Sequence, residues 1–199
     1  MLRLVAPSNS LLDRVLADAR AAEPSYPEVG ATRAAELPGG YRIDRYERRL
    51  GAEPGRFERA VDALLRWQGQ VGAGIRVYPD GAPVEEDGTV LFVVRTLGLW
   101  SVLPCRVVYV DRGDSRFSFG YGTLPGHLER GEVAMSVERA GSGEVVARIE
   151  SFSRTVHPLA RAVLPLSRRI QTRITNRYLD ALERTGQASS SPSQRSASK

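Results

Sequence analysis

Five side chains that can transfer a proton or bind a charged group fall within residues 121–132. Tyr121 closes an aromatic run, and His127, Glu129, Arg130 and Glu132 follow it. A histidine ordinarily titrates at a pKa of about 6.5, so it can exchange protons at neutral pH, and a carboxylate can fix its tautomer. With Tyr121 orienting an oxygen of a substrate and Arg130 meeting an anionic group, this set suits hydrolysis, dehydration or cyclisation.

The same residues have a structural interpretation, which we favour. His127 and Glu129 would cap a turn, while Arg130 and Glu132 would form an ion pair. Structural networks perturb ionisable groups as often as catalytic sites do. Glycine freedom at Gly126 allows the loop to converge on a site but does not enforce it.

The residue types argue against a metal or a cofactor. A catalytic zinc ion needs three converging protein ligands, and the chain has two histidines and one cysteine, Cys105. Arg130 stands among the acids and would compete with a hard cation. The glycines at 69, 72 and 74 lack the spacing of a dinucleotide-binding motif. We therefore expect no metal and no cofactor, and we expect Cys105 to be a buried, unreactive thiol.

Alternating apolar residues predict the strands that would position these groups. Phe117, Phe119 and Tyr121 alternate with small residues, so their three rings share one face of a strand. Short turns containing Gly, Pro and Asp separate the strands, which favours an antiparallel meander. The expected strands are 41–49, 75–78, 89–97, 102–111, 115–121, 131–139 and 145–154.

Three segments have the apolar spacing of helices. Ser8 or Ser10 can cap a helix that runs to about Ala22. A second helix follows Pro54 and is expected to break at the glycines of 69–74. The third is the longest, 158–184, with one apolar stripe and a kink expected at Pro165.

This order of elements predicts an α+β fold in which a curved antiparallel sheet of about seven strands wraps around the long C-terminal helix. It resembles the helix-grip architecture of the START-like, or SRPBCC, superfamily. We divide the chain into an N-terminal helix and strap packed on the domain (1–40), the helix-grip-like domain (41–184) and a disordered tail (185–199). Within the strap, Tyr26, Glu28, Thr32 and Arg33 offer polar contacts to a pocket, although we favour a surface strap.

A closer resemblance rests on the strings YPEVGATR, YRIDRYERRLG, GAGIRVYPDGAPV, LPCRVVYV, FGYGTLPGHLERGE and FSRTVHPLARAVLPLSRRIQ. Together they resemble a domain-of-unknown-function family of bacteria and plants, over residues 26–182. The family usually has proline at Leu128 and commonly a second acid at Val133, which implies a less rigid loop here and no required acid pair. The resemblance carries no established reaction, so it supports the fold more than a function.

Composition limits the possible partners. The chain is 42% hydrophobic and 26% charged, the profile of a soluble globular protein, and its net charge of +5 is spread along its length. We find no signal peptide and no apolar run long enough for a membrane span, and expect a cytoplasmic protein. Arginines at 168, 169, 173 and 177 could face phosphates, but no aromatic residues interleave with them, which argues against nucleic-acid binding.

The leading functional hypothesis is binding of a small apolar molecule in a cavity between the sheet and the C-terminal helix. Arg106 and Arg148 each interrupt an apolar strand. One or both are expected to point inward and pair with an acid such as Glu132 or Glu150, or with the anionic end of a ligand; the alternative is that each lies on the convex, solvent-facing side. The alternatives are a metal-independent enzyme that uses the 121–132 loop and a nucleic-acid-binding protein; the oligomeric state stays open. The expected ligand contacts are Phe92, Arg106, Val108, Phe119, Arg130, Met135, Val163, Ile170 and Ile174.

Overall fold

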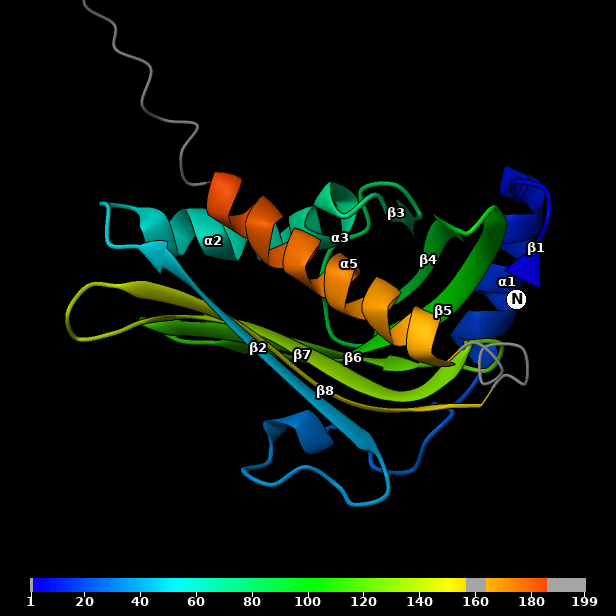
Figure 1. Cartoon of the computed structure of the whole chain (residues 1–199), viewed down its shortest axis with the longest axis horizontal. Helices are drawn as coiled ribbons and strands as arrows, with labels where there is room; N and C mark the ends of the chain where they lie inside the picture. Colours follow the sequence, from blue (N-terminus) through cyan, green and yellow to red (C-terminus); the bar gives the residue numbers. More distant parts are fainter. Residues whose placement is uncertain (1, 157–163, 186–199) are drawn as a thin grey trace, which may run out of the picture.

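The computed structural model describes residues 2–156 and 164–185, which form a curved antiparallel sheet with helix α5 (Leu164–Arg184) lying across one face (Figure 1). The strand order is β2-β8-β7-β6-β5-β4-β3, and the short β1 (Leu2–Arg3) pairs with β5. The first long strand therefore lies beside the last. The strand bounds are β2 (Arg42–Gly51), β3 (Arg76–Tyr78), β4 (Thr89–Thr96), β5 (Leu99–Arg112), β6 (Arg116–Thr123), β7 (Glu129–Arg139) and β8 (Val145–Thr155).

This architecture confirms the predicted α+β helix-grip fold. Each predicted strand is present, with its ends shifted by a few residues, and each pairing is antiparallel. The register between β5 and β6 shifts between Val107 and Tyr109, which marks an irregularity at Val108. A bulge of this kind reverses which face the following residues present.

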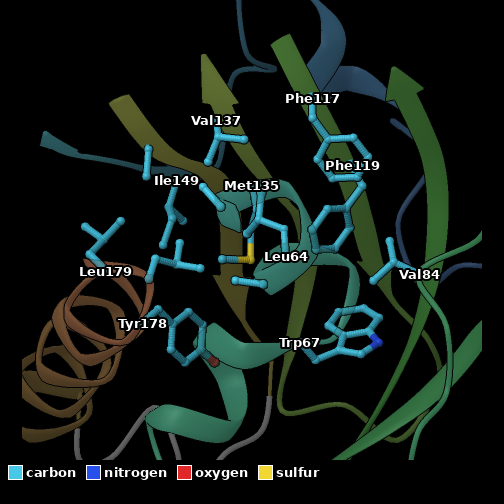
Figure 2. Close-up of a cluster of buried hydrophobic side chains, with 14 of the residues drawn as sticks. Leu64, Trp67, Val84, Phe117, Phe119, Met135, Val137, Ile149, Tyr178 and Leu179 are labelled. Atoms are coloured by element: carbon cyan, nitrogen blue, oxygen red, sulfur yellow. The ribbon is translucent and has the colours of Figure 1, made fainter. Parts of the chain in front are cut away.

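The main core lies between the concave face of the sheet and helices α2 (Arg56–Leu65), α3 (Gln68–Gly72) and α5 (Figure 2). Trp67 meets Phe92 and Phe119 edge-to-face, with ring centroids 5.4 and 5.3 Å apart. Leu179 of α5 and Met135 of β7 are also fully buried. Burial of each large apolar side chain contributes about 2–3 kcal/mol, so this layer holds α5 on the sheet.

The predicted helix break at the glycines is wrong in position. The chain turns at Trp67, which adopts a positive φ of 56°, and Gly69 and Gly72 lie inside α3. Helix α5 packs closely against both of these glycines. A Cβ atom on Gly72 would overlap Ala181, and one on Gly69 would lie 3.5 Å from the Cβ atom of Tyr178.

Helix α1 (Asn9–Ala21) covers the convex face of β4 and β5. Ser8 caps it, as predicted, by accepting a hydrogen bond of 3.3 Å from the Leu11 amide. Its apolar face forms a second core with side chains of β4, β5 and the segment after β6, namely Leu12, Leu16, Ala19, Leu91, Val93, Val102 and Leu124.

The predicted start of the last helix and its disordered tail fall at 157–163 and 186–199, outside the described residues. In the described helix Pro165 lies in the first turn. None of the described helices combines the length and apolar character needed to cross a membrane.

Candidate functional site

The structure places Tyr121 and Glu132 on opposite faces of the sheet. Tyr121 lies on the concave face, where its ring meets Phe92 at 5.2 Å and Trp67 at 5.8 Å. Glu132 pairs with Gly122, the next residue of β6, and therefore points to the convex face. Burial raises the pKa of the Tyr121 hydroxyl above its ordinary value. These two members of the candidate catalytic set do not converge.

Glu132 fastens the strap, residues 26–41, to the convex face. Its carboxylate is 1% exposed and accepts hydrogen bonds from the Tyr26 hydroxyl at 2.6 Å and the Gly30 amide at 2.7 Å. Thr32 donates its amide at 3.0 Å and also its hydroxyl. Such donors stabilise a buried carboxylate without a cation. Arg130 is exposed, and within the described residues the donors of the strap take the place of the expected Arg130–Glu132 ion pair.

The glycines of β6 explain how the strap fits. A Cβ atom on Gly120 would overlap the Tyr109 ring, and one on Gly122 would overlap the Tyr26 ring and hydroxyl. Burial, and then the charge of Glu132, raise the pKa of Tyr26 above its ordinary range. The alternation FGYG therefore sends rings to one face and leaves room for rings on the other. Tyr109 was not predicted from the sequence as a residue of this face. The small residues in the FGYG alternation were the signal that a ring from another strand would pack there.

His127 is held by its own loop. Its Nδ1 atom accepts a hydrogen bond of 3.0 Å from the Glu129 amide and lies 3.1 Å from the Glu129 carbonyl oxygen. Burial lowers the pKa of the imidazole to about 4, so the ring is neutral at pH 7. The Glu129 carboxylate accepts a hydrogen bond from Thr155 at 3.4 Å. These contacts are those of a capped turn.

Three more residues that the sequence singled out, Arg106, Val108 and Arg148, lie on the convex face. Arg106 donates to the carbonyl oxygens of Ala19 and Arg20, both at 3.1 Å, at the C-terminal end of α1. Val108, at the register shift, lies near Gly30 of the strap, so it does not line the concave face. The structure thus corrects the expected inward contacts of Arg106 and Val108: both flank Val107, which faces the concave side, so alternation along β5 turns their side chains away from α5.

Arg148 also faces outward. It pairs with Glu47 of β2 at 2.8 Å and Glu138 of β7 at 2.6 Å, rather than with Glu132 or Glu150. All four of these acids lie on the convex face, so the choice of partners depends on cross-strand register.

The apolar candidates Phe92, Phe119 and Met135 do come together on the concave face, where all three are buried. Trp67 covers the two rings, and Gln70 donates to the Met135 sulfur at 3.2 Å. Around these side chains, the space between the sheet and the helices is therefore closely packed core. Ile174 of α5 is half-buried and borders this core. Val163 and the side chain of Ile170 lie outside the described part of the chain.

The exposure of side chains on the concave face differs from one end of α5 to the other. Near the C-terminal end of the helix, Tyr178, Leu179 and Leu182 are 8%, 1% and 1% exposed. Farther along the sheet, Leu103 of β5 and Val133 of β7 border the core and stay partly exposed. This less covered surface is the candidate ligand site.

Cys105 is buried on the same face as Leu103, and burial raises the pKa of its thiol. Among residues 2–156 and 164–185, no three His, Cys, Asp or Glu side chains gather closely enough to hold a metal ion. Arg173 and Arg177 are exposed on α5. The side chains at 168 and 169 lie outside the described part of the chain.

Comparisons with known proteins agree with the fold. A UPF0548 protein of Deinococcus radiodurans is 34% identical over 196 residues, covering 92% of this chain and 98% of that protein. A UPF0548 protein of Arabidopsis thaliana is 34% identical over 127 residues, or 61% of this chain and 62% of that protein. The structure of norcoclaurine synthase from Thalictrum flavum, in complex with dopamine and hydroxybenzaldehyde, superposes with a TM-score of 0.51 at 12% identity, covering 76% and 90% of the two chains.

The family comparison confirms the resemblance seen in the sequence. Residues 25–181 match the family model described as Domain of unknown function (DUF1990). The matched range begins at the strap and ends in α5, so it includes both faces of the sheet. The chain therefore belongs to the DUF1990 family, which here has a START-like helix-grip fold.

Proposed function

We propose that this protein binds a small, mostly apolar molecule between the concave face of the sheet and the N-terminal half of α5. The observation that carries this proposal is the partial exposure of Leu103 and Val133 beside a fully buried core. Removing such apolar surface from water is favourable, by about 25 cal/mol per Å². A bound molecule would supply the cover that the described side chains leave incomplete.

Polar groups on the same surface would orient that molecule. Ser151 of β8 lies in register between Val133 and Asp44 of β2, and all three share the concave face. Asp44 pairs with Arg42 at 2.7 Å, and both side chains are partly buried. We infer a ligand with an apolar body and one polar end, because ligand sites combine apolar walls with a few placed polar groups.

The fold supports this choice by analogy. The norcoclaurine synthase with which the chain superposes is in complex with dopamine and hydroxybenzaldehyde, two small aromatic molecules. At 12% identity the likeness concerns the fold, so the ligand class is our proposal. We propose binding rather than catalysis because Tyr121 and Glu132 lie on opposite faces of the sheet.

Thermal-shift and native mass-spectrometric screens against lipids, isoprenoids, polyketides and small phenols would test the proposal. We expect at least one apolar class to raise the melting temperature and to be retained as a complex. Val133→Phe should fill the surface and weaken that binding about tenfold or more. Val71→Phe is the matched control, because Val71 is 50% exposed on α3. A screen without hits, or equal binding by both variants, would refute the proposal.

A further inference from the structure

A second hollow lies on the convex face, on the opposite side of the sheet from α5. Its volume is about 830 Å³, and its floor is formed by Ser118 of β6 with Ala134 and Ser136 of β7. The strap borders it at Thr32 and Arg33. Figure 1 shows the strap and α5 on opposite sides of the sheet, so this hollow is separate from the proposed apolar site.

The floor is open because the rings that cover this face of β6 extend only as far as Gly120. Tyr26 and Tyr109 occupy the space above Gly122 and Gly120. The next residue on that face, Ser118, lines the hollow, and its hydroxyl has no hydrogen-bond partner within the described residues. The Ser118 hydroxyl is accessible from the hollow, so it can donate or accept a hydrogen bond there.

The walls of the hollow carry charges of both signs, and one arginine is left without an acidic partner. Four arginines and four acids of this face line the hollow, and each acid is already in an ion pair: Arg33–Asp111, Arg45–Glu150, Arg148–Glu47 and Arg148–Glu138. Arg116 has no ion-pair partner in the part of the chain that the structure describes. Arg112 also borders the hollow, but its guanidinium lies over the Phe117 ring, 5.3 Å from the ring centroid, on the side of the concave face. Arg116 lies two residues before Ser118 and shares its face.

We propose that this convex-face hollow binds a small polar molecule with a carboxylate or phosphate group. Arg116 would bind the anionic group, and the hydroxyls of Ser118 and Ser136 would donate hydrogen bonds to its oxygens. Arginine suits both anions because its planar guanidinium can donate two parallel hydrogen bonds. An apolar ligand would leave charged walls desolvated, and a cation would find every lining acid already paired. The volume falls in the range of small-molecule sites, about 300–1,000 Å³.

NMR titration of the ¹⁵N-labelled full chain tests this site directly, with inorganic phosphate, succinate and uncharged glucose as probes at low salt. We expect saturable shifts in the amides of 116–120 and 134–138 with at least one anion. The two anions separate a phosphate site from a carboxylate site. Arg116→Ala and Ser118→Ala should each weaken that anion, with Arg116→Ala raising its Kd about tenfold.

Arg173→Ala is the matched control, since Arg173 is exposed on α5, across the sheet from the hollow. It should leave the Kd unchanged, and the spectrum of each variant reports whether the fold is intact. The proposal is overturned if neither anion binds, or if shifts scatter over surface arginines without saturating. Equal binding by glucose, or an unchanged Kd in Arg116→Ala, would also overturn it.

Discussion

The two faces of one strand, β6, are built by different means. On the concave face, Phe119 and Tyr121 are large rings packed against Trp67. On the convex face, Gly120 and Gly122 are empty positions that rings of other segments fill. The concave face is therefore held by burial of its own side chains, whereas the convex face is held by hydrogen bonds from a strap to one carboxylate.

The largest expected effect is on the concave face. Phe119→Ala should lower the free energy of unfolding by about 3–5 kcal/mol, because it removes a fully buried ring and leaves a cavity beside Trp67. Urea denaturation would measure this loss. Val71→Ala on the exposed side of α3 should change stability by less than about 0.5 kcal/mol. A small effect of Phe119→Ala would mean that this face is not the principal core.

Glu132→Gln is the sharpest test of the convex face. An amide can accept through one oxygen only, so donors from Tyr26, Gly30 or Thr32 would face an NH₂ group. We expect a loss of about 2–3 kcal/mol and faster proteolysis within the strap. Glu129→Gln is the control, since it makes the same change at a carboxylate that accepts from Thr155 of β8, and it should leave the strap protected. Unchanged protection of the strap in Glu132→Gln would contradict its attachment through Glu132.

Gly122→Ala tests the empty positions of the same face. The added methyl group would overlap the Tyr26 ring, so we expect a loss of about 1–3 kcal/mol and displacement of Tyr26. Urea denaturation would measure the loss. Gly141→Ala introduces the same methyl group where no atom lies within 4 Å, and should be nearly neutral. Equal stability of the two variants would show that Gly122 is not needed for space.

The smallest effect concerns His127, in the loop that joins β6 to β7. Burial lowers its pKa to about 4 in the folded chain, against about 6.5 unfolded. The unfolded state therefore binds more protons between these values, so His127 contributes stability above pH 6.5 that is lost as pH falls towards 4. We expect about 1–2 kcal/mol over this window, allowing for partial exposure. Urea unfolding of His127→Gln should show a flatter pH dependence; an unchanged profile would refute the assignment.

Local patterns predicted much of the fold. Alternation along β6 placed Phe117, Phe119 and Tyr121 on one face, and the spacing of apolar residues located the long C-terminal helix. Both are properties of a few consecutive residues. The site residues were harder to place, because alternation gives the relative faces of neighbours but not which side chain from a distant segment lies above them.

Sequence by itself determined the order of helices and strands, the rings of β6 and the small residues between them, since backbone periodicity sets all three. Only the tertiary structure decided that Glu132 meets Tyr26, which lies 106 residues away in the chain. It also decided that the cross-strand register turns Arg106 towards α1. These outcomes depend on which distant segments pack together, and that choice minimises unpaired polar groups and exposed apolar surface over the whole chain rather than in any one element.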